Sequence, residues 1–467
     1  MENKSWLRFI PDAVSIVVAI MAFLAVLTWI IPAGVFETMV NEQGREIVVP
    51  GTYHTVASNP QGFFSFLTAP FSGIVSAASI IAFVLIVGGA FKVIQATGAI
   101  NAGLKSIVTL SVTYPKFKSL MLAVLMFFFS IGGATFGMSE EVLVFVLITI
   151  PLTLKMGYDS ITGVAIPFVG AGAGFAGAFL NPFTIGIAQG IADVPIFSGF
   201  SYRLLVWFAF TALAIWFVLR YMKKIERNPQ TSLMYKIDQK RDLSDFENTT
   251  ESFTLRHKLV LGMLALSLGL LVYGVNVYGW YIAEISALFF GLALFSAIVG
   301  GITPKLTSES FVKGAEEMVL AALVIGLARG ILVIAEDGKI IHTMLDYAVS
   351  LTDGLPAYIT VQFMFFIQTF LNFFIPSGSG QAALTMPIMA PLSDLMGISR
   401  QTAVLAYQLG DGITNLIVPT SGVVMGILAI AKIPYQVWFK WIWKLLLLFT
   451  ILAMLFLIPP VLFFEWL

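Results

Sequence analysis

The sequence predicts an all-α membrane protein that crosses the bilayer many times and consists of two related halves of opposite orientation. Hydrophobic residues make up 58% of the 467 positions and charged residues only 11%, which is outside the usual balance of soluble globular domains. Apolar stretches of about 20 residues, the length of a helix that crosses a bilayer, recur along the chain. The ten-residue alternation of outer-membrane barrels is missing. We therefore expect helices in a lipid bilayer.

Charge and cysteine content exclude several other classes of protein. The formal net charge is zero, so nothing in the charge balance supports a nucleic-acid partner. The chain has no cysteine, which excludes disulfides and thiolate chemistry. The expected partners are the lipid bilayer and a small solute.

The first apolar run, 13–31, is expected to be a membrane helix and not a signal peptide. Lys4 and Arg8 precede it, as basic residues precede a secretory signal. The run is longer than a secretory apolar region, however, and no A-x-A-type cleavage site precedes Pro32.

Basic residues orient the helices, because Lys and Arg accumulate in cytoplasmic loops. The long polar stretch at 220–258 is rich in Lys and Arg, and we place it in the cytoplasm. The loop at 37–60 contains Glu37, Glu42 and Glu46 against the single Arg45, which suits the outside. This predicts a bacterial inner-membrane protein with a cytoplasmic N-terminus and an external C-terminus.

About nine transmembrane helices and two re-entrant hairpins are expected. The first repeat, 1–222, contains spans near 13–31 and 79–96, a hairpin at about 118–155, a broken helix at about 160–192 and a helix near 204–219. A cytoplasmic loop at 223–257 and a connecting helix at 258–278 follow. The second repeat, 279–467, contains spans from about 283 and near 319–335, a hairpin at about 357–391, a broken helix at about 400–430 and a last helix near 445–464. The connecting helix inverts the second repeat.

An internal repeat supports this division. Residues 156–172 align without a gap to residues 396–412, at an offset of 240. A similar offset pairs 82–86 with 321–325, and the glycine-rich tip of the first hairpin with that of the second. Two apolar, glycine-rich helices can resemble each other by composition alone. Near-coincident offsets at three separate places favour an inverted repeat of the kind found in transporters.

Four breaks in apolar segments predict the binding site, because irregular backbone at membrane depth is tolerated only where protein or a water-filled cavity satisfies it. They lie at 131–139 and 376–381 in the hairpins, and at 172–182 and 410–421 in the broken helices. Half-helix N-termini favour anionic oxygens, and C-terminal carbonyls suit Na⁺. The side chains and backbone expected at these ends belong to Gly133, Thr135, Ser139, Asn181, Ser377, Gly378, Ser379, Gly380, Asn415, Thr420 and Ser421. For any one hydroxyl, a local capping bond is an equal alternative.

Four charged residues are predicted inside the membrane. A charge there is costly unless it has a partner of opposite charge, so an unpaired one indicates a functional role. Glu140 and Glu141 follow the first hairpin tip, and Asp411 lies between two glycines of the second broken helix. We assign these acids to ion coupling, and Asp411 is expected to bind a proton, Na⁺ or a substrate ammonium unless it belongs to a structural ion pair. Arg329 could bind a substrate carboxylate, although pairing with Asp411 or Glu141 is the favoured expectation.

Intramembrane enzymes are a competing class with poor support. The three histidines, His54, His257 and His342, form no H-E-x-x-H motif, so no metal beyond Na⁺ is expected. The tip at 377–380 lacks the leading glycine of a rhomboid-type serine motif. An aspartyl pair of Asp159 and Asp411 lacks the first glycine of G-x-G-D, and a helix N-cap explains Asp159 more simply. A passive channel would not require paired hairpins.

Three motifs occur at 27–34 in the first helix, at 376–383 with 386–387, and at 408–415 with 419–422. Together they resemble the DcuC C4-dicarboxylate carrier family, in particular its YfcC-type members, within the ion transporter superfamily. The resemblance implies an elevator-type transporter, in which a domain of hairpins and broken helices moves against a dimeric scaffold. It also implies ion-coupled symport or antiport of dicarboxylates or, among relatives, of arginine and ornithine. The first tip lacks the paired serines of the second.

These observations together predict a proton- or Na⁺-coupled secondary transporter of small carboxylates or amino acids, without another cofactor. The alternative is a basic amino acid exchanger of the arginine/ornithine type. An anionic or zwitterionic substrate and a homodimer are expected.

Overall fold

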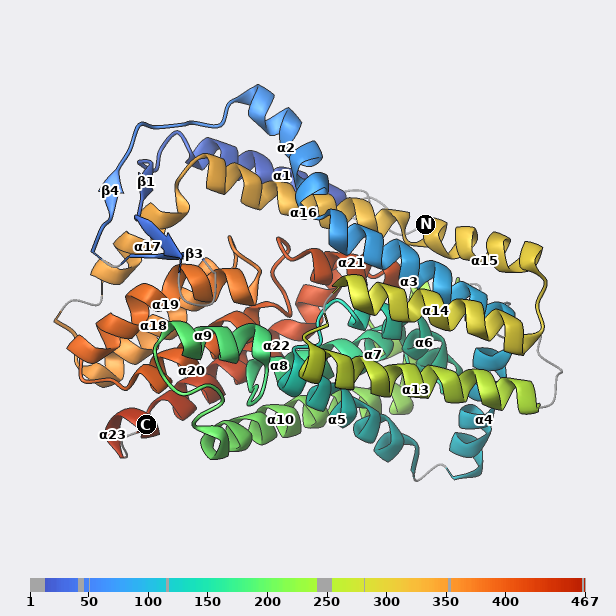
Figure 1. Ribbon diagram of the computed structural model, residues 1–467. Helices are drawn as coiled ribbons and strands as arrows, with labels where there is room; N and C mark the ends of the chain where they lie inside the picture. Colours follow the sequence, from blue (N-terminus) through green and yellow to red (C-terminus); the bar gives the residue numbers. More distant parts are fainter. Residues whose placement is uncertain are drawn as a thin grey trace, which may run out of the picture.

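The computed structural model in Figure 1 consists almost entirely of helices, with four short strands near the N-terminal end of the chain. It describes residues 13–40, 46–49, 51–114, 117–241, 254–280, 282–351, 354–463 and 466. The strands and α17 (Ile341–Ser350) lie at one end of the molecule, and α4 (Ala99–Thr113) lies at the other (Figure 1). The predicted helical class is therefore confirmed.

Five helices in the described part of the chain are long and apolar enough to cross a membrane, and a sixth results if α15 and α16 form one bent span. Several other apolar helices are shorter, with 10 to 17 residues. They include one helix beside each of the four predicted breaks: Val142–Lys155, Ser160–Ala176, Ala357–Leu371 and Gly422–Ala431. A helix that is interrupted part-way is too short to cross a membrane by itself. The expected number of nine spans and two hairpins therefore stays a prediction.

One group of helices packs together through α3 and α16. Its elements are α1 (Ala13–Leu27), α2 (Phe63–Ser76), α3 (Ala78–Ala96), α4, α13 (Leu255–Tyr278), α14 (Ile282–Gly300), α15 (Pro304–Glu317) and α16 (Val319–Asp337). Helix α16 packs against α1 and α2, α3 packs against α14 and α15, and α13 packs against α14 and α4. We call this set the α16 group.

A second group contains the helices next to the predicted breaks. Its elements are α5 (Lys118–Phe136), α6 (Val142–Lys155), α7 (Ser160–Val164), η3 (Ala165–Val169), α8 (Gly170–Ala176), η4 (Pro182–Gly186), α9 (Ile187–Ile191), α10 (Phe200–Arg227), α18 (Ala357–Leu371), α19 (Gly378–Leu395), α20 (Arg400–Thr414), α21 (Gly422–Ala431), α22 (Tyr435–Leu457) and α23 (Pro459–Leu462). Helix α5 packs on α8, α18 packs on α20, and α20 also contacts α8. We call this set the α20 group, and it meets the α16 group mainly where α21 lies against α16.

Local sequence signals set the helix ends inside the α20 group. Gly137 ends α5 in the left-handed conformation, with φ of 71°, which glycine adopts without steric cost. The Asn181 side chain accepts a hydrogen bond from the Phe183 N–H at the start of η4. Ser377 and Ser421 cap α19 and α21 in the same manner. These caps satisfy backbone N–H groups that would otherwise lack partners.

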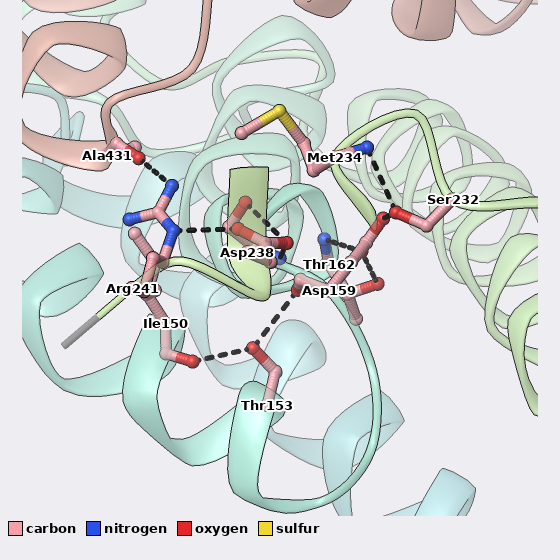
Figure 2. Close-up of polar contacts among 10 residues, drawn as sticks. Ile150, Thr153, Asp159, Thr162, Ser232, Met234, Asp238, Arg241 and Ala431 are labelled. Atoms are coloured by element: carbon pink, nitrogen blue, oxygen red, sulfur yellow. Dashed lines mark hydrogen bonds and ion pairs between the residues drawn. The ribbon is translucent and has the colours of Figure 1, made fainter. Parts of the chain in front are cut away.

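Asp159 caps α7 as the sequence predicts, and it also holds a segment that follows α10. Its Oδ1 accepts hydrogen bonds from the backbone N–H and the hydroxyl of Thr162, at 2.9 and 2.7 Å. Its Oδ2 accepts from the hydroxyls of Tyr221 and Ser232, both at 2.6 Å. Figure 2 shows Asp159 between Thr162 and Ser232.

Asp238 and Arg241 connect the segment after α10 to both broken helices. It lies at the end of α11 (Tyr235–Asp238), which follows the short helix η5 (Pro229–Thr231), and its Oδ2 accepts from the backbone N–H and hydroxyl of Ser160. Arg241 pairs with Asp238 at 2.7 Å and donates to the Ala431 carbonyl at the end of α21 (Figure 2). Residues 228–241 therefore join the start of α7 to the end of α21.

Replacement of Asp159 by alanine should lower the free energy of unfolding by about 2–4 kcal/mol, because a buried carboxylate that caps a helix and accepts further hydrogen bonds is lost. Chemical unfolding in detergent micelles measures the change. Glu309→Ala is the control, since Glu309 and Lys305 form an exposed pair at 3.8 Å whose loss should cost less than about 0.5 kcal/mol. Equal effects of the two variants would contradict this account of Asp159.

The four strands form two small antiparallel pairs near α17. They are β1 (Gly34–Val35) with β4 (His54–Thr55), and β2 (Thr38–Val40) with β3 (Glu46–Val48). The backbone N–H of Phe36 donates to Nδ1 of His342 at 3.0 Å, and the Tyr53 hydroxyl donates to the Thr343 hydroxyl at 3.1 Å. This segment is therefore attached to α17 through an imidazole nitrogen that carries no proton.

Acidification should weaken this attachment. Burial lowers the pKa of His342 from its ordinary value of 6.5, so the unfolded chain binds the proton more tightly than the folded chain. The contribution of His342 to stability is present above pH 6.5 and is lost as the pH falls through the lowered pKa. Thermal unfolding at a series of pH values measures it. His342→Asn offers an oxygen acceptor that does not titrate and should make the profile flatter; an unchanged profile would contradict the assignment.

Candidate functional site

A cavity of about 280 Å³, lined by charged, polar and apolar residues, lies between the α16 group and the α20 group. The tips of both helix pairs contribute to it, through residues 137–142 and 376–379. The breaks of the interrupted helices add Phe183, Thr184, Asn415 and Ser421. The opposite wall comes from the α16 group and is formed by Ser76, Ser79, Ile80, Trp280, Ile282, Ile285 and Arg329.

Nine residues of the predicted site line this cavity: Ser139, Glu140, Glu141, Arg329, Ser377, Gly378, Ser379, Asn415 and Ser421. They come from positions as far apart in the chain as 139 and 421. The cavity therefore brings the two glycine-rich tips and the second break together at one place.

Six predicted residues do not line it. The Thr135 hydroxyl donates to the Ile131 carbonyl, and the Thr420 hydroxyl donates to the Phe373 carbonyl. Gly133 contacts the Ala171 carbonyl, since a Cβ there would overlap that oxygen. For these three positions the structure shows local bonds or helix packing. Gly380 lies one turn into α19, and Asn181 and Asp411 are buried behind the cavity wall.

Two helices begin beside the cavity with backbone N–H groups that have no partner within the helix. Helix α19 begins after Ser377, and α21 begins after Ser421. Helix N-termini attract anionic oxygens through these N–H groups and the helix dipole. At α6, which begins after Glu141, the first N–H groups donate to the carbonyls of residues 139–141. The Ser139 N–H donates to Glu141 Oε2 at 3.0 Å, so this carboxylate bonds to the backbone of its own hairpin tip.

The charges of the cavity lie on opposite walls. Glu140 and Glu141 lie at the tip between α5 and α6, whereas Arg329 lies on α16. The expectation that Arg329 pairs with Asp411 or Glu141 is wrong, because Arg329 Nε donates instead to the Ser76 hydroxyl at 3.2 Å. No ion pair among the described residues joins Arg329 to either acid. Arg329 lines the cavity from α16, and it also interacts electrostatically with Glu336 on the same helix.

Asp411 is wholly buried behind Gly378. Its Oδ1 accepts a hydrogen bond from the Asn415 amide at 3.0 Å, and its Oδ2 has no hydrogen-bond partner. A Cβ on Gly378 would lie 3.1 Å from that oxygen and 2.5 Å from Cγ2 of Thr184. Only glycine therefore fits between the cavity and the acid.

Sequence reasoning missed Thr184, Ser76 and Trp280. Thr184 lines the cavity, and its buried hydroxyl has no partner. It follows the Asn181-Pro182 break by two residues, so extending the break by half a helical turn would have included it. Ser76 is the last residue of α2, and Trp280 lies in the short connection between α13 and α14, where no break in the apolar pattern marks them.

A charged cavity between two groups of apolar helices is typical of a membrane carrier. Comparison with known proteins agrees with this class. The model of the DcuC family, C4-dicarboxylate anaerobic carriers, matches residues 10–461. The chain belongs to this family. It is accordingly a multi-pass membrane protein and a secondary transporter, and not an enzyme.

Two relatives and two solved structures are similar to the chain. The Escherichia coli K12 protein named "putative basic amino acid antiporter YfcC" is 34% identical and aligns over 94% of each chain. An uncharacterised Haemophilus influenzae protein is 34% identical over 85% of this chain and 78% of its own. The Alcanivorax borkumensis YdaH transporter has a TM-score of 0.42 and 16% identity, covering 95% of this chain and 98% of its own. Neisseria gonorrhoeae MtrF, of a class of antimetabolite efflux pumps, has a TM-score of 0.41 and 18% identity, covering 97% and 96%.

Proposed function

We propose that this chain is an ion-coupled secondary transporter of small carboxylates or amino acids. The observation that carries the proposal is the cavity of about 280 Å³, which is lined both by the start of α19 at Ser377 and by Arg329. Helix N-termini and arginine both bind carboxylate oxygens. The coupling ion in this proposal is a proton or Na⁺, and the acids assigned to it are Asp411, Glu140 and Glu141.

An elevator movement fits the position of the cavity. In this proposal the α20 group is the transport domain, the α16 group is the scaffold, and the two hairpins with their broken helices form an inverted repeat. The order of elements supports it, since a helix pair followed by an interrupted helix occurs at α5–α9 and again at α18–α21. We further propose a homodimer in the bacterial inner membrane, with the N-terminus in the cytoplasm and the C-terminus outside.

Exchange of basic amino acids is the second candidate, and a specific observation favours it. Glu140 and Glu141 lie together at the cavity, and no described Lys or Arg forms an ion pair with either of them. A cationic side chain or ammonium group would neutralise this charge, which is costly to carry through a bilayer. The name of the Escherichia coli relative points in the same direction.

Thermal-shift screening separates the two candidates, because a ligand stabilises the folded protein in proportion to its occupancy. Succinate represents the dicarboxylates, and arginine and ornithine represent the basic amino acids. At a concentration of about 100 times its Kd, the true substrate should add about 2.7 kcal/mol of stability. Uptake or exchange of the stabilising compound in proteoliposomes must follow. If neither class stabilises the protein or is transported, the proposed substrates are wrong.

A further inference from the structure

We propose that the α16 group offers the cavity a second position, at which Lys92 lines it as Arg329 lines it in this structure. This inference rests on the proposed transport function, and it names the basic residue that meets the solute after the α20 group has moved. It follows from a correspondence between two bent helix pairs, α2–α3 and α15–α16.

The two helix pairs have the same construction. Helices α2 and α15 each have 14 residues, and α3 and α16 each have 19. One residue interrupts each pair: Ala77, with φ of −95° and ψ of 9°, and Met318, with φ of −92° and ψ of −7°. Every boundary in the second pair lies 241 positions after its counterpart. Because α2 packs on α16 and α3 packs on α15 (Figure 1), the pairs run antiparallel, as the halves of an inverted repeat do.

Their closest contacts also correspond. Gly73 on α2 and Gly314 on α15 lie four positions before the interrupting residues. A Cβ on Gly73 would lie 2.3 Å from the Gly326 carbonyl oxygen, and a Cβ on Gly314 would lie 2.3 Å from the Gly88 carbonyl oxygen. Each crossing therefore brings backbone against backbone at the same place in its helix pair.

A basic residue next to each crossing bonds to the end of the facing helix. Arg329 on α16 donates to the hydroxyl of Ser76, the last residue of α2, at 3.2 Å. Lys92 on α3 pairs with Glu317, the last residue of α15, with 2.8 Å between Nζ and Oε1. Ser76 and Glu317 are counterparts at the offset of 241. Arg329 and Ser76 line the cavity, whereas Lys92 and Glu317 do not.

The spacing of the two basic residues gives the length of the movement. Arg329 follows the first residue of α16 by ten positions, and Lys92 follows the first residue of α3 by 14. At about 1.5 Å per residue, these segments are about 15 and about 21 Å long. A rigid-body shift of the α20 group by about this length along α3 and α16 takes the cavity from Arg329 to Lys92.

Charge explains why the second position needs a basic residue. Glu140 and Glu141 lie at the tip of the first hairpin, so they travel with the cavity. Two acids at membrane depth are costly without a positive charge nearby, and Arg329 provides one at the first position. A lysine ammonium is a point charge on a flexible stem, so that of Lys92 can turn from Glu317 towards the acids or a solute carboxylate. Loss of Lys92 should therefore disfavour the second position and leave the first unchanged.

Cysteine pairs in the full-length protein in lipid test the second position, because the chain has no cysteine of its own. Ser379→Cys with Ser79→Cys reports the first position, since both residues line the cavity. Ser379→Cys with Leu320→Cys reports the second, since Leu320 is the counterpart of Ser79 at the offset of 241 and is exposed. Ser379→Cys with Ile298→Cys is the control, on the exposed side of α14. A short bifunctional thiol reagent should join the first two pairs only. A second pair that joins no faster than the control would overturn the inference.

Variants of Lys92 separate its role in the second position from a static ion pair. Lys92→Met should lower the yield of the second cross-link relative to the first at least about fivefold, which is the lower end of common coupling effects. Lys92→Arg should retain the ratio. Lys305→Met is the matched control, because Lys305 forms an exposed pair with Glu309 on α15. A static ion pair predicts a lower Tm of Lys92→Met with an unchanged ratio of cross-links, and this result would overturn the assignment of Lys92.

Uptake of labelled succinate and labelled arginine into proteoliposomes keeps this inference separate from the proposed function. Lys92→Met should slow uptake of the transported probe at least about fivefold, in line with its effect on the second cross-link. Transport by a wild type whose second pair never joins would overturn the second position and leave the transport function intact. If both cross-links form and neither probe is transported, the proposed substrates fail and the second position stands.

Discussion

Valine in place of Gly174 should prevent the chain from reaching a stable folded state. A Cβ at this position would overlap the carbonyl oxygen of Ser130 and lie 2.7 and 2.8 Å from its carbonyl carbon and Cα. All three atoms are backbone, so no side-chain rotation relieves the overlap, and α8 must move away from α5. The cost should exceed about 3 kcal/mol, which is large for a single substitution.

Gly262→Val is the matched control, because no atom lies within 4 Å of a Cβ added at Gly262 on α13. Both variants replace a helical glycine by the same residue, and helix propensity alone predicts slight stabilisation. The yield of monodisperse protein and its apparent Tm, followed by size-exclusion chromatography, should fall sharply for Gly174→Val only. A normal yield of Gly174→Val would mean that α5 and α8 do not cross as closely as the structure places them.

The class of the protein was predictable because short stretches of sequence are enough to recognise apolar membrane segments and helix ends. Apolar length and the scarcity of charge predict a helical membrane protein. The caps at Asp159, Ser377 and Ser421 lie next to the helices that they begin. The DcuC family could be predicted from motifs, since the three motifs that carry the resemblance are short contiguous segments of this sequence, and the family model matches residues 10–461.

Contacts between distant segments were beyond the reach of these local signals. The expected ion pair between Arg329 and Asp411 or Glu141 was wrong. Such a pair depends on which side of α16 faces the α20 group, and the segments that carry these residues are far apart in sequence. Asp159 was predicted as a cap, yet its bonds to Tyr221 and Ser232 depend on how residues 228–241 fold back. The position of Asp411 behind Gly378, and its closeness to Thr184, depend equally on packing between the two interrupted helices.

A methyl group at Gly378 should reduce solute uptake at least about tenfold. In Gly378→Ala the new Cβ would lie 2.5 Å from Thr184 Cγ2, 3.1 Å from Asp411 Oδ2 and 3.4 Å from the Tyr407 hydroxyl oxygen. Thr184 is β-branched and has few alternative rotamers, and Asn415 and burial hold Asp411 in place. The start of α19 must therefore shift. Overpacking strain is typically about 1–3 kcal/mol, and strain of about 1.4 kcal/mol or more within this range corresponds to about tenfold or more in an equilibrium that transport requires.

Gly380→Ala, two residues along the same helix, separates this effect from a general intolerance of alanine. Its Cβ would lie 3.2 Å from the Ser377 hydroxyl oxygen, 3.4 Å from Ser377 Cβ and 3.6 Å from a methyl group of Ile375. These are side-chain atoms at distances that a few tenths of an ångström relieve, and alanine favours the helix by about 1 kcal/mol. Uptake of the stabilising solute, normalised to reconstituted protein, should therefore fall far less in Gly380→Ala than in Gly378→Ala. Equal losses would place the constraint in helix α19 as a whole, whereas a loss confined to Gly378→Ala would place it at the contact with Thr184 and Asp411.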